Sequence, residues 1–139
     1  MIAAIPDSFK DLVEGPISVA LTTVMPDGQP QTTVVWCNYD GTHVLINTMS
    51  RFQKAKNLRA NPKVTILAWR RSKPLRYLEV RGTVVEMTEE GAMQHLDELA
   101  VLYTGKAPYF GEVIPAEWKD RETPVLCKIA PTRVVAKSV

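Results

Sequence analysis

Short runs of apolar and β-branched residues, many alternating with polar ones, follow one another through the first 50 residues. Runs of this length bounded by turn sequences are typical of antiparallel strands. The separators "PDGQP" (26–30) and "DG" (40–41) favour turns, because Pro, Gly and Asp supply the backbone conformations that turns require. After a short helical start at 7–14, the pattern predicts a meander of strands at 17–24, 31–39 and 43–48.

The second half of the chain carries longer strand-like segments. One strand is predicted at 63–70, and a longer one at 76–87 bends at Gly82, where the missing side chain suits a bulge. The segment 124–139 predicts one or two further strands around a turn at Pro131. Six or seven short antiparallel strands with two or three short helices indicate a mainly β fold, a single barrel domain spanning residues 1–139.

Two segments have helical spacing. The first, "RFQKAKNLRA" (51–60), ends before the pair "NP", because a residue that precedes proline is pushed away from helical angles. Ser50 and Gln53 have the spacing of a capping box, which places the helix start at the beginning of this segment. The second helix is predicted within 88–105, with an apolar stripe on one face and Gly105 as its C-terminal cap.

Composition excludes some classes of function. The formal net charge is +2, with 17 Lys and Arg against 15 Asp and Glu, which is too small for a general nucleic-acid-binding protein. No stretch approaches the roughly 18 apolar residues of a membrane span, and the N-terminal segment lacks a basic region followed by an apolar run. We therefore expect a cytoplasmic protein that binds neither nucleic acid nor a membrane.

Cysteine and histidine are too sparse for a disulfide framework or a metal site. Cys37 and Cys127 lie in separate apolar segments, and no CxxC pair occurs. His43 and His95 form no HExxH-like spacing, so each is interpreted as a surface or packed histidine and no metal is expected. No Ser-His-Asp, Cys-His or paired-carboxylate arrangement stands out, so no side chain is predicted to be catalytic.

Positive charge gathers in one short segment, "TMSRFQKAKNLRANPKV" (48–64), although the chain as a whole is nearly neutral. A solvated helix surface is one interpretation. The alternative is an anion site, because a helix N-terminus offers free backbone N–H groups and the positive end of the helix dipole. Short polar side chains precede the cations, and each charge-assisted hydrogen bond to a phosphate would contribute about 1.5–3 kcal/mol. The predicted phosphate pocket comprises Asn47, Thr48, Ser50, Lys54 and Lys56.

The order of these segments resembles a known family. The hairpin "PDGQPQTTVVW", the segment "TMSRFQKAKNLRANPKVTIL", the strand "RYLEVRGTV" and the helix "HLDELAVLYTG" are similar in order and spacing to split β-barrel flavin and deazaflavin oxidoreductases related to pyridoxamine 5′-phosphate oxidase. The resemblance covers residues 9–137 and is greater to the branch that uses the deazaflavin coenzyme F420. It implies hydride transfer between F420 and a small organic substrate, and a homodimer with the cofactor at the subunit interface.

The resemblance also assigns phosphate contacts. Lys54 and Lys56 match the family's basic phosphate-binding positions. Thr48 and Ser50 match its small polar phosphate neighbours, and the shared "NLRxNP" signature begins at Asn57.

Contacts to the isoalloxazine ring are assigned in the same way. Tyr77 matches a position at which the oxidase has a glutamine, and the chain lacks the oxidase's Arg-x-His substrate motif near its C-terminus. Oxidation of pyridoxamine phosphate is therefore disfavoured. The strand backbone that the family runs beneath the ring corresponds to Thr33, Val34, Val35 and Trp36.

Other functions stay open. An FMN-dependent reductase or oxidase would use the same phosphate pocket, although the additional cations Arg51, Arg59 and Lys63 favour a cofactor with a carboxylate tail. A non-catalytic flavin- or haem-binding protein is another alternative, with His43 and His95 as its only imidazoles. A small basic nucleic-acid-binding barrel is the third.

Three tryptophans could line a flat-ring site. Trp36 and Trp69 lie in predicted strands and are interpreted as core residues. Trp118 lies in the loop-like stretch from Lys106 to Glu122 and is predicted to line a substrate pocket or the dimer interface. This loop is expected to shape substrate specificity.

Overall fold

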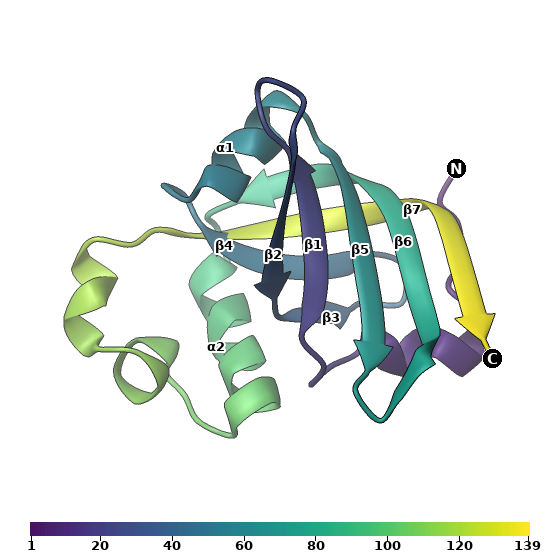
Figure 1. Cartoon of the computed structure of the whole chain (residues 1–139). Helices are drawn as coiled ribbons and strands as arrows, with labels where there is room; N and C mark the ends of the chain where they lie inside the picture. The colour runs from purple at the N-terminus through teal and green to yellow at the C-terminus, as the bar shows by residue number, and fades with distance from the viewer.

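Seven antiparallel strands form one curled sheet in the computed structural model, which describes all 139 residues. The strand order is β2–β1–β5–β6–β7–β4–β3, so the sheet wraps into a half-barrel with β2 and β3 at its two edges (Figure 1). The mainly β barrel predicted from the sequence is confirmed. The strands are β1 (Val19–Val24), β2 (Pro30–Val35), β3 (Cys37–Tyr39), β4 (Val44–Met49), β5 (Lys63–Arg70), β6 (Lys73–Thr88) and β7 (Pro124–Ser138).

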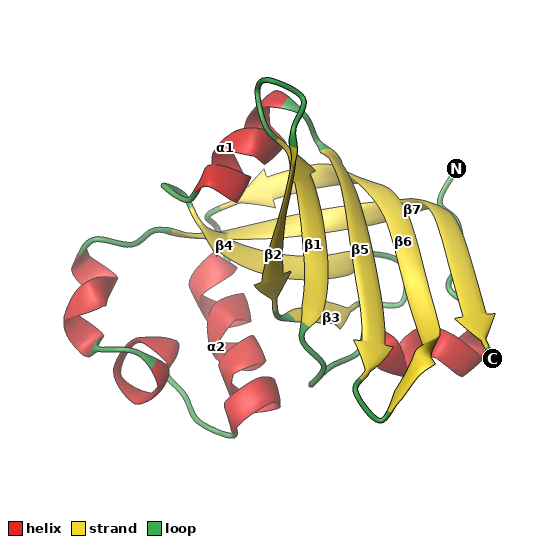
Figure 2. Cartoon of the chain, viewed as in Figure 1, coloured by secondary structure: helices red, strands yellow, loops and turns green.

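The helices lie at the ends and along one side of the sheet (Figure 2). α1 (Gln53–Ala60) contacts β1 and β4 at one end of the half-barrel, and α2 (Ala92–Thr104) packs beside β4 and β7. No helix is long and apolar enough to cross a membrane. Three short helical turns complete the fold: η1 (Asp7–Leu12), η2 (Tyr109–Val113) and η3 (Ala116–Asp120).

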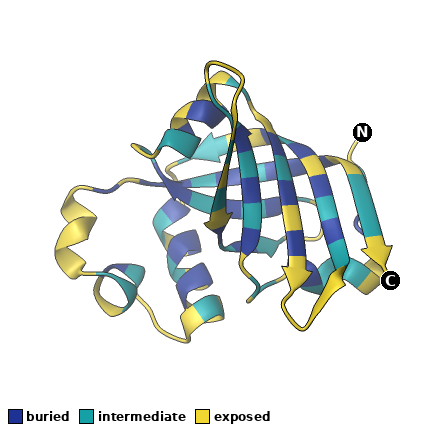
Figure 3. Ribbon diagram, in the orientation of Figure 1, coloured by how far each residue is buried: buried dark blue, intermediate teal, exposed yellow.

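The hydrophobic core fills the concave side of the sheet. Buried and partly exposed residues alternate along the strands, because successive side chains of a strand point to opposite faces (Figure 3). Leu21, Ile66 and Ile129 are fully buried there. Leu12 of η1 and Leu58 of α1 join the same cluster and cover its two ends. Full burial of a leucine or isoleucine side chain contributes about 1.5–3 kcal/mol.

The predicted strand at 31–39 is in fact two strands on opposite edges of the sheet. Val35 pairs with Val19 of β1, whereas Cys37 pairs with Ile46 of β4. Trp36, which belongs to neither strand, lies at the point where the chain passes from one edge to the other. This break between β2 and β3, at Trp36, is the split of the barrel.

The predicted turn at Pro131 is wrong, because β7 continues through this residue. Pro131 lies opposite Gly82 of β6, where the register of the two strands shifts. The bend predicted at Gly82 is confirmed by this shift. A Cβ atom at Gly82 would lie 2.7 Å from the carbonyl oxygen of Ala130, so only glycine allows β7 to approach this closely.

The capping box predicted for the charged helix is also wrong. α1 begins at Gln53, its N-cap is Phe52, and no side chain caps it. The Ser50 hydroxyl instead accepts a hydrogen bond from Arg59 Nη2 at 2.7 Å, and Arg59 Nη1 donates to the Ser50 carbonyl oxygen at 3.0 Å. Gln53 Nε2 donates to Asn57 Oδ1 at 2.8 Å and does not reach back to Ser50. For α2, which begins later than predicted, the cap at Gly105 is confirmed.

Candidate functional site

Strand β2 offers a free backbone edge. It pairs with β1 alone, since it ends the sheet on one side. Alternate residues of an edge strand direct their N–H and C=O groups away from the single partner, where a ligand can meet them. The predicted ring-contacting residues occupy this strand and its end: Thr33, Val34, Val35 and Trp36.

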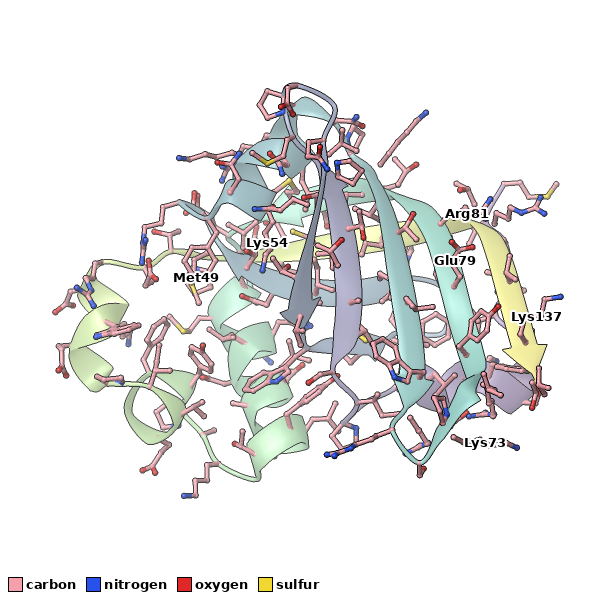
Figure 4. The ribbon with its side chains drawn as sticks, viewed as in Figure 1. Met49, Lys54, Lys73, Glu79, Arg81 and Lys137 are labelled. Atoms are coloured by element: carbon pink, nitrogen blue, oxygen red, sulfur yellow. The ribbon has the colours of Figure 1, made fainter.

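Lys54 is a half-buried cation without a carboxylate partner. Of the seven ion pairs in the structure, none includes Lys54. Burial lowers the pKa of its ammonium, and its one charge-related contact is the Phe52 ring, 5.9 Å from Nζ. An ammonium removed from water is stabilised when an anion lies beside it. Lys54 and Met49 lie on the same side of the molecule, between α1 and α2 (Figure 4).

Asn57 joins α1 to the β1–β2 hairpin. Its side chain is 1% exposed, and Nδ2 donates to Thr23 Oγ1 at 3.0 Å and to Gln31 Oε1 at 3.3 Å. Its Oδ1 accepts from Gln53, so the amide is fully engaged within the chain. Lys54 precedes Asn57 by three residues, and residues at this spacing lie on the same side of a helix. Lys54 therefore lies on the same side of α1 as Asn57, whose amide bonds Gln31 of β2.

Thr48 and Asn47 face opposite sides of β4, because they are adjacent residues of one strand. Thr48 is 4% exposed, and its hydroxyl has no hydrogen-bond partner in the chain. Asn47 lies beneath α2, where Nδ2 donates to the carbonyl oxygen of Ala92 at 2.9 Å and contacts His95 Nδ1 at 3.1 Å. The structure therefore separates Asn47 from the core-facing side occupied by Thr48.

Two of the additional cations have partners within the chain. Arg51 forms two hydrogen bonds with the Glu122 carboxylate, which is buried, and Arg59 binds Ser50. Lys56 and Lys63 are exposed and take part in no ion pair. The unneutralised positive charge near α1 is thus mainly that of lysines.

Tyr77 does not join these residues within one chain. It lies on the outer face of β6, opposite Trp69 of β5 and Lys137 of β7. It lines an open cavity of about 480 Å³ together with residues that include Thr32, Leu67, Glu79 and Arg81. Strands β1 and β5 separate Tyr77 from β2 in the sheet.

An aromatic cluster of Trp36, Tyr103, Tyr109 and Phe110 lies at the split. Trp36 stacks on Tyr103 with ring centroids 5.0 Å apart, and Tyr109 meets Trp36 edge-on at 6.0 Å. Phe110 is buried and contacts Tyr109 edge-on at 5.1 Å. The sequence does not predict Tyr103 as a site residue, nor the cluster itself. The cluster forms only because α2 and the loop that follows it fold back onto β3.

The other tryptophans lie outside this cluster. Trp69 is 38% exposed on the outer sheet face, so its predicted place in the core is wrong. Trp36 is only half-buried, at the split and not within the core. Trp118 is 38% exposed on η3, with the Arg121 guanidinium 4.7 Å from its ring centroid.

His95 is a packed histidine, as predicted. It is 5% exposed, Nδ1 contacts Asn47, and Nε2 lies 2.9 Å from Asn38 Oδ1. Burial lowers the pKa of its imidazole to about 4, so it is neutral near pH 7. Both ring nitrogens of His95 are engaged, whereas the His43 ring contacts Asp40 through Nδ1 alone. No cluster of three or more His, Cys, Asp or Glu side chains could hold a metal ion.

The site thus combines a half-barrel that has a free edge strand with a half-buried lysine that takes part in no ion pair. The chain matches the model of the pyridoxamine 5′-phosphate oxidase family over residues 5–138 and belongs to this family. The fold is that of flavin-binding proteins, many of them oxidoreductases.

Several solved structures are similar over most of their length. An F420 reductase is 30% identical, with a TM-score of 0.81 and with 94% of this chain and 98% of that chain covered. The conserved hypothetical protein Rv2991 from Mycobacterium tuberculosis is 27% identical, with a TM-score of 0.75 and coverage of 99% and 86%. HupZ from Group A Streptococcus, 21% identical with a TM-score of 0.68 and coverage of 95% and 93%, shows the fold alone. The comparison with curated proteins gave no match.

Proposed function

We propose that this chain is an F420-dependent oxidoreductase that transfers a hydride to a small organic substrate. The observation that carries the proposal is Lys54, a half-buried cation without a carboxylate partner, on the side of α1 where Asn57 bonds to β2. The similarity to an F420 reductase over nearly the whole chain supports this choice of cofactor.

The residues present fit the phosphate and the ring of such a cofactor. Lys54 and Lys56 would bind the phosphate, with the Thr48 hydroxyl as a donor that the chain leaves unsatisfied. Ser50, already bonded to Arg59, would lie at the same end of α1. The backbone of Thr33–Trp36 would hold the ring edge through its unpaired N–H and C=O groups.

The chain's own contribution to the reaction is then binding and orientation. When bound, the deazaflavin supplies the hydride chemistry. Lys54 and Lys56 would hold the phosphate end and the β2 edge would hold the ring end, so these residues would orient the cofactor. The chemistry needs no acidic side chain, because solvent can deliver the accompanying proton.

We also propose a homodimer in which the outer face of β1, β2, β5 and β6 is the interface. This face exposes large apolar side chains: Val34 is 74% exposed, and Leu67 and Trp69 are each 38% exposed. A second copy would cover them, and a stable interface of about 800 Å² per partner fits a sheet of this size. Tyr77, which lies on this face, would reach a cofactor only across the interface.

FMN is the second candidate cofactor. Arg51 is neutralised by Glu122, which removes one of the cations that favoured a carboxylate tail. A phosphate and a flavin ring alone would satisfy Lys54 and the β2 edge. An FMN-dependent reductase or oxidase therefore fits the same residues.

The test is a titration of the purified apo-protein with F420 and, separately, with FMN. Tighter binding of F420 supports the proposal, and preference for FMN favours the second candidate. The double variant Lys54→Ala/Lys56→Ala should weaken cofactor binding about a hundredfold, since two charge-assisted contacts are lost. Lys73→Ala/Lys137→Ala, at the far end of the sheet, is the matched control (Figure 4). Unchanged affinity in the α1 double variant would contradict the phosphate site.

The dimer is tested by sedimentation of the wild-type chain and of Leu67→Arg. A charge at the centre of the proposed interface should convert the dimer to a monomer. A wild-type chain that sediments as a monomer at micromolar concentration would contradict the interface.

A further inference from the structure

Strands β5 and β6 carry a polar cavity on the outer face of the sheet. It has a volume of about 290 Å³ and is lined by Lys63, Val64, Thr65, Arg81, Gly82, Thr83 and Thr132. Val64 and Gly82 are buried, and the four polar residues that alternate with them along the two strands are exposed or half-buried. None of the residues proposed to hold the phosphate or the ring of the cofactor lines this cavity.

The register of the two strands places cations and hydroxyl groups at alternate corners of a rectangle. Lys63 lies opposite Thr83, and Thr65 lies opposite Arg81. Opposite residues of an antiparallel pair have Cα atoms about 4.5–5.5 Å apart, and residues two positions apart in one strand are separated by about 7 Å. The two threonines thus lie on one diagonal, and the two long cationic side chains lie on the other and can reach across it. Four donors can therefore converge on one anion.

Positive charge exceeds negative charge around the cavity. Lys63 takes part in no ion pair, and Arg81 pairs only with Glu79, at 3.0 Å. Arg133 of β7, which is also unpaired, lies directly opposite Arg81 on the other side of β6. Like charges directly opposite each other in a sheet are destabilising. An anion beside the two guanidinium groups would remove this repulsion.

The hydroxyl groups indicate which anion fits. Of the threonines that line the cavity, only Thr132 has its hydroxyl engaged, as a donor to the Arg81 carbonyl oxygen at 3.1 Å. Thr65 and Thr83 are half-buried, and their hydroxyl groups are left as donors. A carboxylate has two oxygens to offer, whereas a phosphate group has at least three strong acceptor oxygens and up to two negative charges. Two cations and two hydroxyl donors therefore match a phosphate group better.

We infer that this cavity is an anion site, separate from the one proposed on α1, which binds the phosphate group of a small molecule, either free phosphate or a phosphate monoester. Lys63 and Arg81 neutralise the charge, and the two threonine hydroxyls donate from between them. The inference does not depend on the proposed cofactor. The cavity lies at the end of β5 that follows α1, whereas Leu67 and Trp69 of the proposed dimer interface lie further along this strand.

The test is a titration of the double variant Lys54→Ala/Lys56→Ala with inorganic phosphate, because the pocket proposed on α1 is disabled in this chain. Amide shifts are followed by ¹⁵N NMR while phosphate replaces chloride at constant ionic strength. We expect saturable shifts at the β5 and β6 residues that line the cavity. Adding Lys63→Gln should raise the Kd about fivefold or more, since a charge-assisted hydrogen bond is lost. Lys137→Gln, which removes a positive charge from β7 opposite Tyr77 and outside the cavity, is the matched control (Figure 4).

Thermal unfolding tests the role of Arg133. Arg133→Gln removes the like charge opposite Arg81, so we expect it to raise the melting temperature by about 1–3 °C in phosphate-free buffer of low salt. The same variant should gain less from added phosphate than its parent chain does. A lower melting temperature without phosphate, together with an undiminished gain from phosphate, would overturn the place of Arg133 beside the anion.

A parallel titration with glycerol 3-phosphate identifies the source of the phosphate group. Binding at least threefold tighter than that of phosphate supports a site for a phosphorylated small molecule, and equal or weaker binding supports a site for the free ion. Phosphate-dependent shifts confined to other parts of the chain would overturn the inference. A Kd that Lys63→Gln leaves unchanged would overturn it as well. No cofactor is present in these titrations, so their outcome is independent of the test of the proposed function.

Discussion

Arg51 and Glu122, 71 positions apart in the chain, form a two-pronged ion pair at the start of α1. Arg51 Nε donates to Glu122 Oε1 at 2.5 Å and Nη2 donates to Oε2 at 2.9 Å. The carboxylate side chain is 3% exposed, whereas the guanidinium side chain is 61% exposed. Next to the pair, the Ser50 backbone N–H donates to the Thr123 carbonyl oxygen at 2.8 Å. The end of the loop that carries Tyr109 is thus fastened to the segment that leads into the lysine-bearing helix.

Loss of this pair should free the loop without unfolding the barrel. Arg51→Met leaves the buried Glu122 carboxylate without a cation, which costs more than the pair itself contributes. We expect limited proteolysis within residues 106–121 to become faster, on the order of tenfold. Adding Glu122→Gln should restore most of the resistance, because no buried charge is then left unpaired. Lys119→Met, an exposed position in the same loop, should be cleaved at the wild-type rate.

His95 should make the stability of the fold depend on pH. Its imidazole pKa is lowered from 6.5 to about 4 by burial, so the folded chain favours the neutral form. The associated stability is present above the unfolded pKa of 6.5 and is lost as the pH falls toward 4, about 3 kcal/mol in all. Urea unfolding at pH 7.5, 6, 5 and 4 should therefore show a flatter profile for His95→Gln than for wild type. A pH profile for His95→Gln that runs parallel to that of wild type would contradict the assignment.

Local patterns predict most strands, because alternation and turn residues act over a few positions. β1, β4 and β5 begin and end close to the predicted residues. The break at Trp36 could not be predicted in this way, since the apolar pattern runs through it unbroken. It arises because Val35 and Cys37 pair with strands on opposite sides of the barrel, a long-range property.

Competition between partners explains the other errors. The spacing of Ser50 and Gln53 suits a capping box. The Ser50 hydroxyl instead accepts a hydrogen bond from Arg59, which lies at the opposite end of α1. The pairing of Arg51 with Glu122 has no local signal at all, so the additional cations were interpreted as free. Lys54 and Lys56 could be proposed as phosphate ligands from the sequence alone, because the helix, the cations and the small polar residues are contiguous there.

Gly82 should be intolerant of a side chain. A Cβ atom there would lie 2.7 Å from the Ala130 carbonyl oxygen and 2.8 Å from a methyl group of Ile129, and the backbone atom cannot move aside cheaply. We expect Gly82→Ala to lower the free energy of unfolding by about 2 kcal/mol or more, measured by urea denaturation. Thr83 is the next residue of β6 and is half-buried, and Thr83→Ala should lower the free energy of unfolding by less than Gly82→Ala does. An equal loss of unfolding free energy in Gly82→Ala and Thr83→Ala would show that β6 and β7 can move apart at Gly82.

Thr48 should show opposite effects on stability and on cofactor binding. Its hydroxyl is buried without a partner, so Thr48→Val removes an unsatisfied polar group and should raise the stability of the apo-protein by about 1 kcal/mol. The same substitution should weaken F420 binding about fivefold, because the proposed phosphate donor is lost. Thr23→Val is the matched control, since Thr23 is 1% exposed and its hydroxyl accepts from Asn57 Nδ2 at 3.0 Å. That variant should lose about 1–2 kcal/mol of stability in urea denaturation. If Thr48→Val is more stable than wild type but binds F420 with wild-type affinity, Thr48 is not part of the phosphate site. If Thr48→Val is less stable than wild type, the Thr48 hydroxyl does have a hydrogen-bond partner in the folded chain.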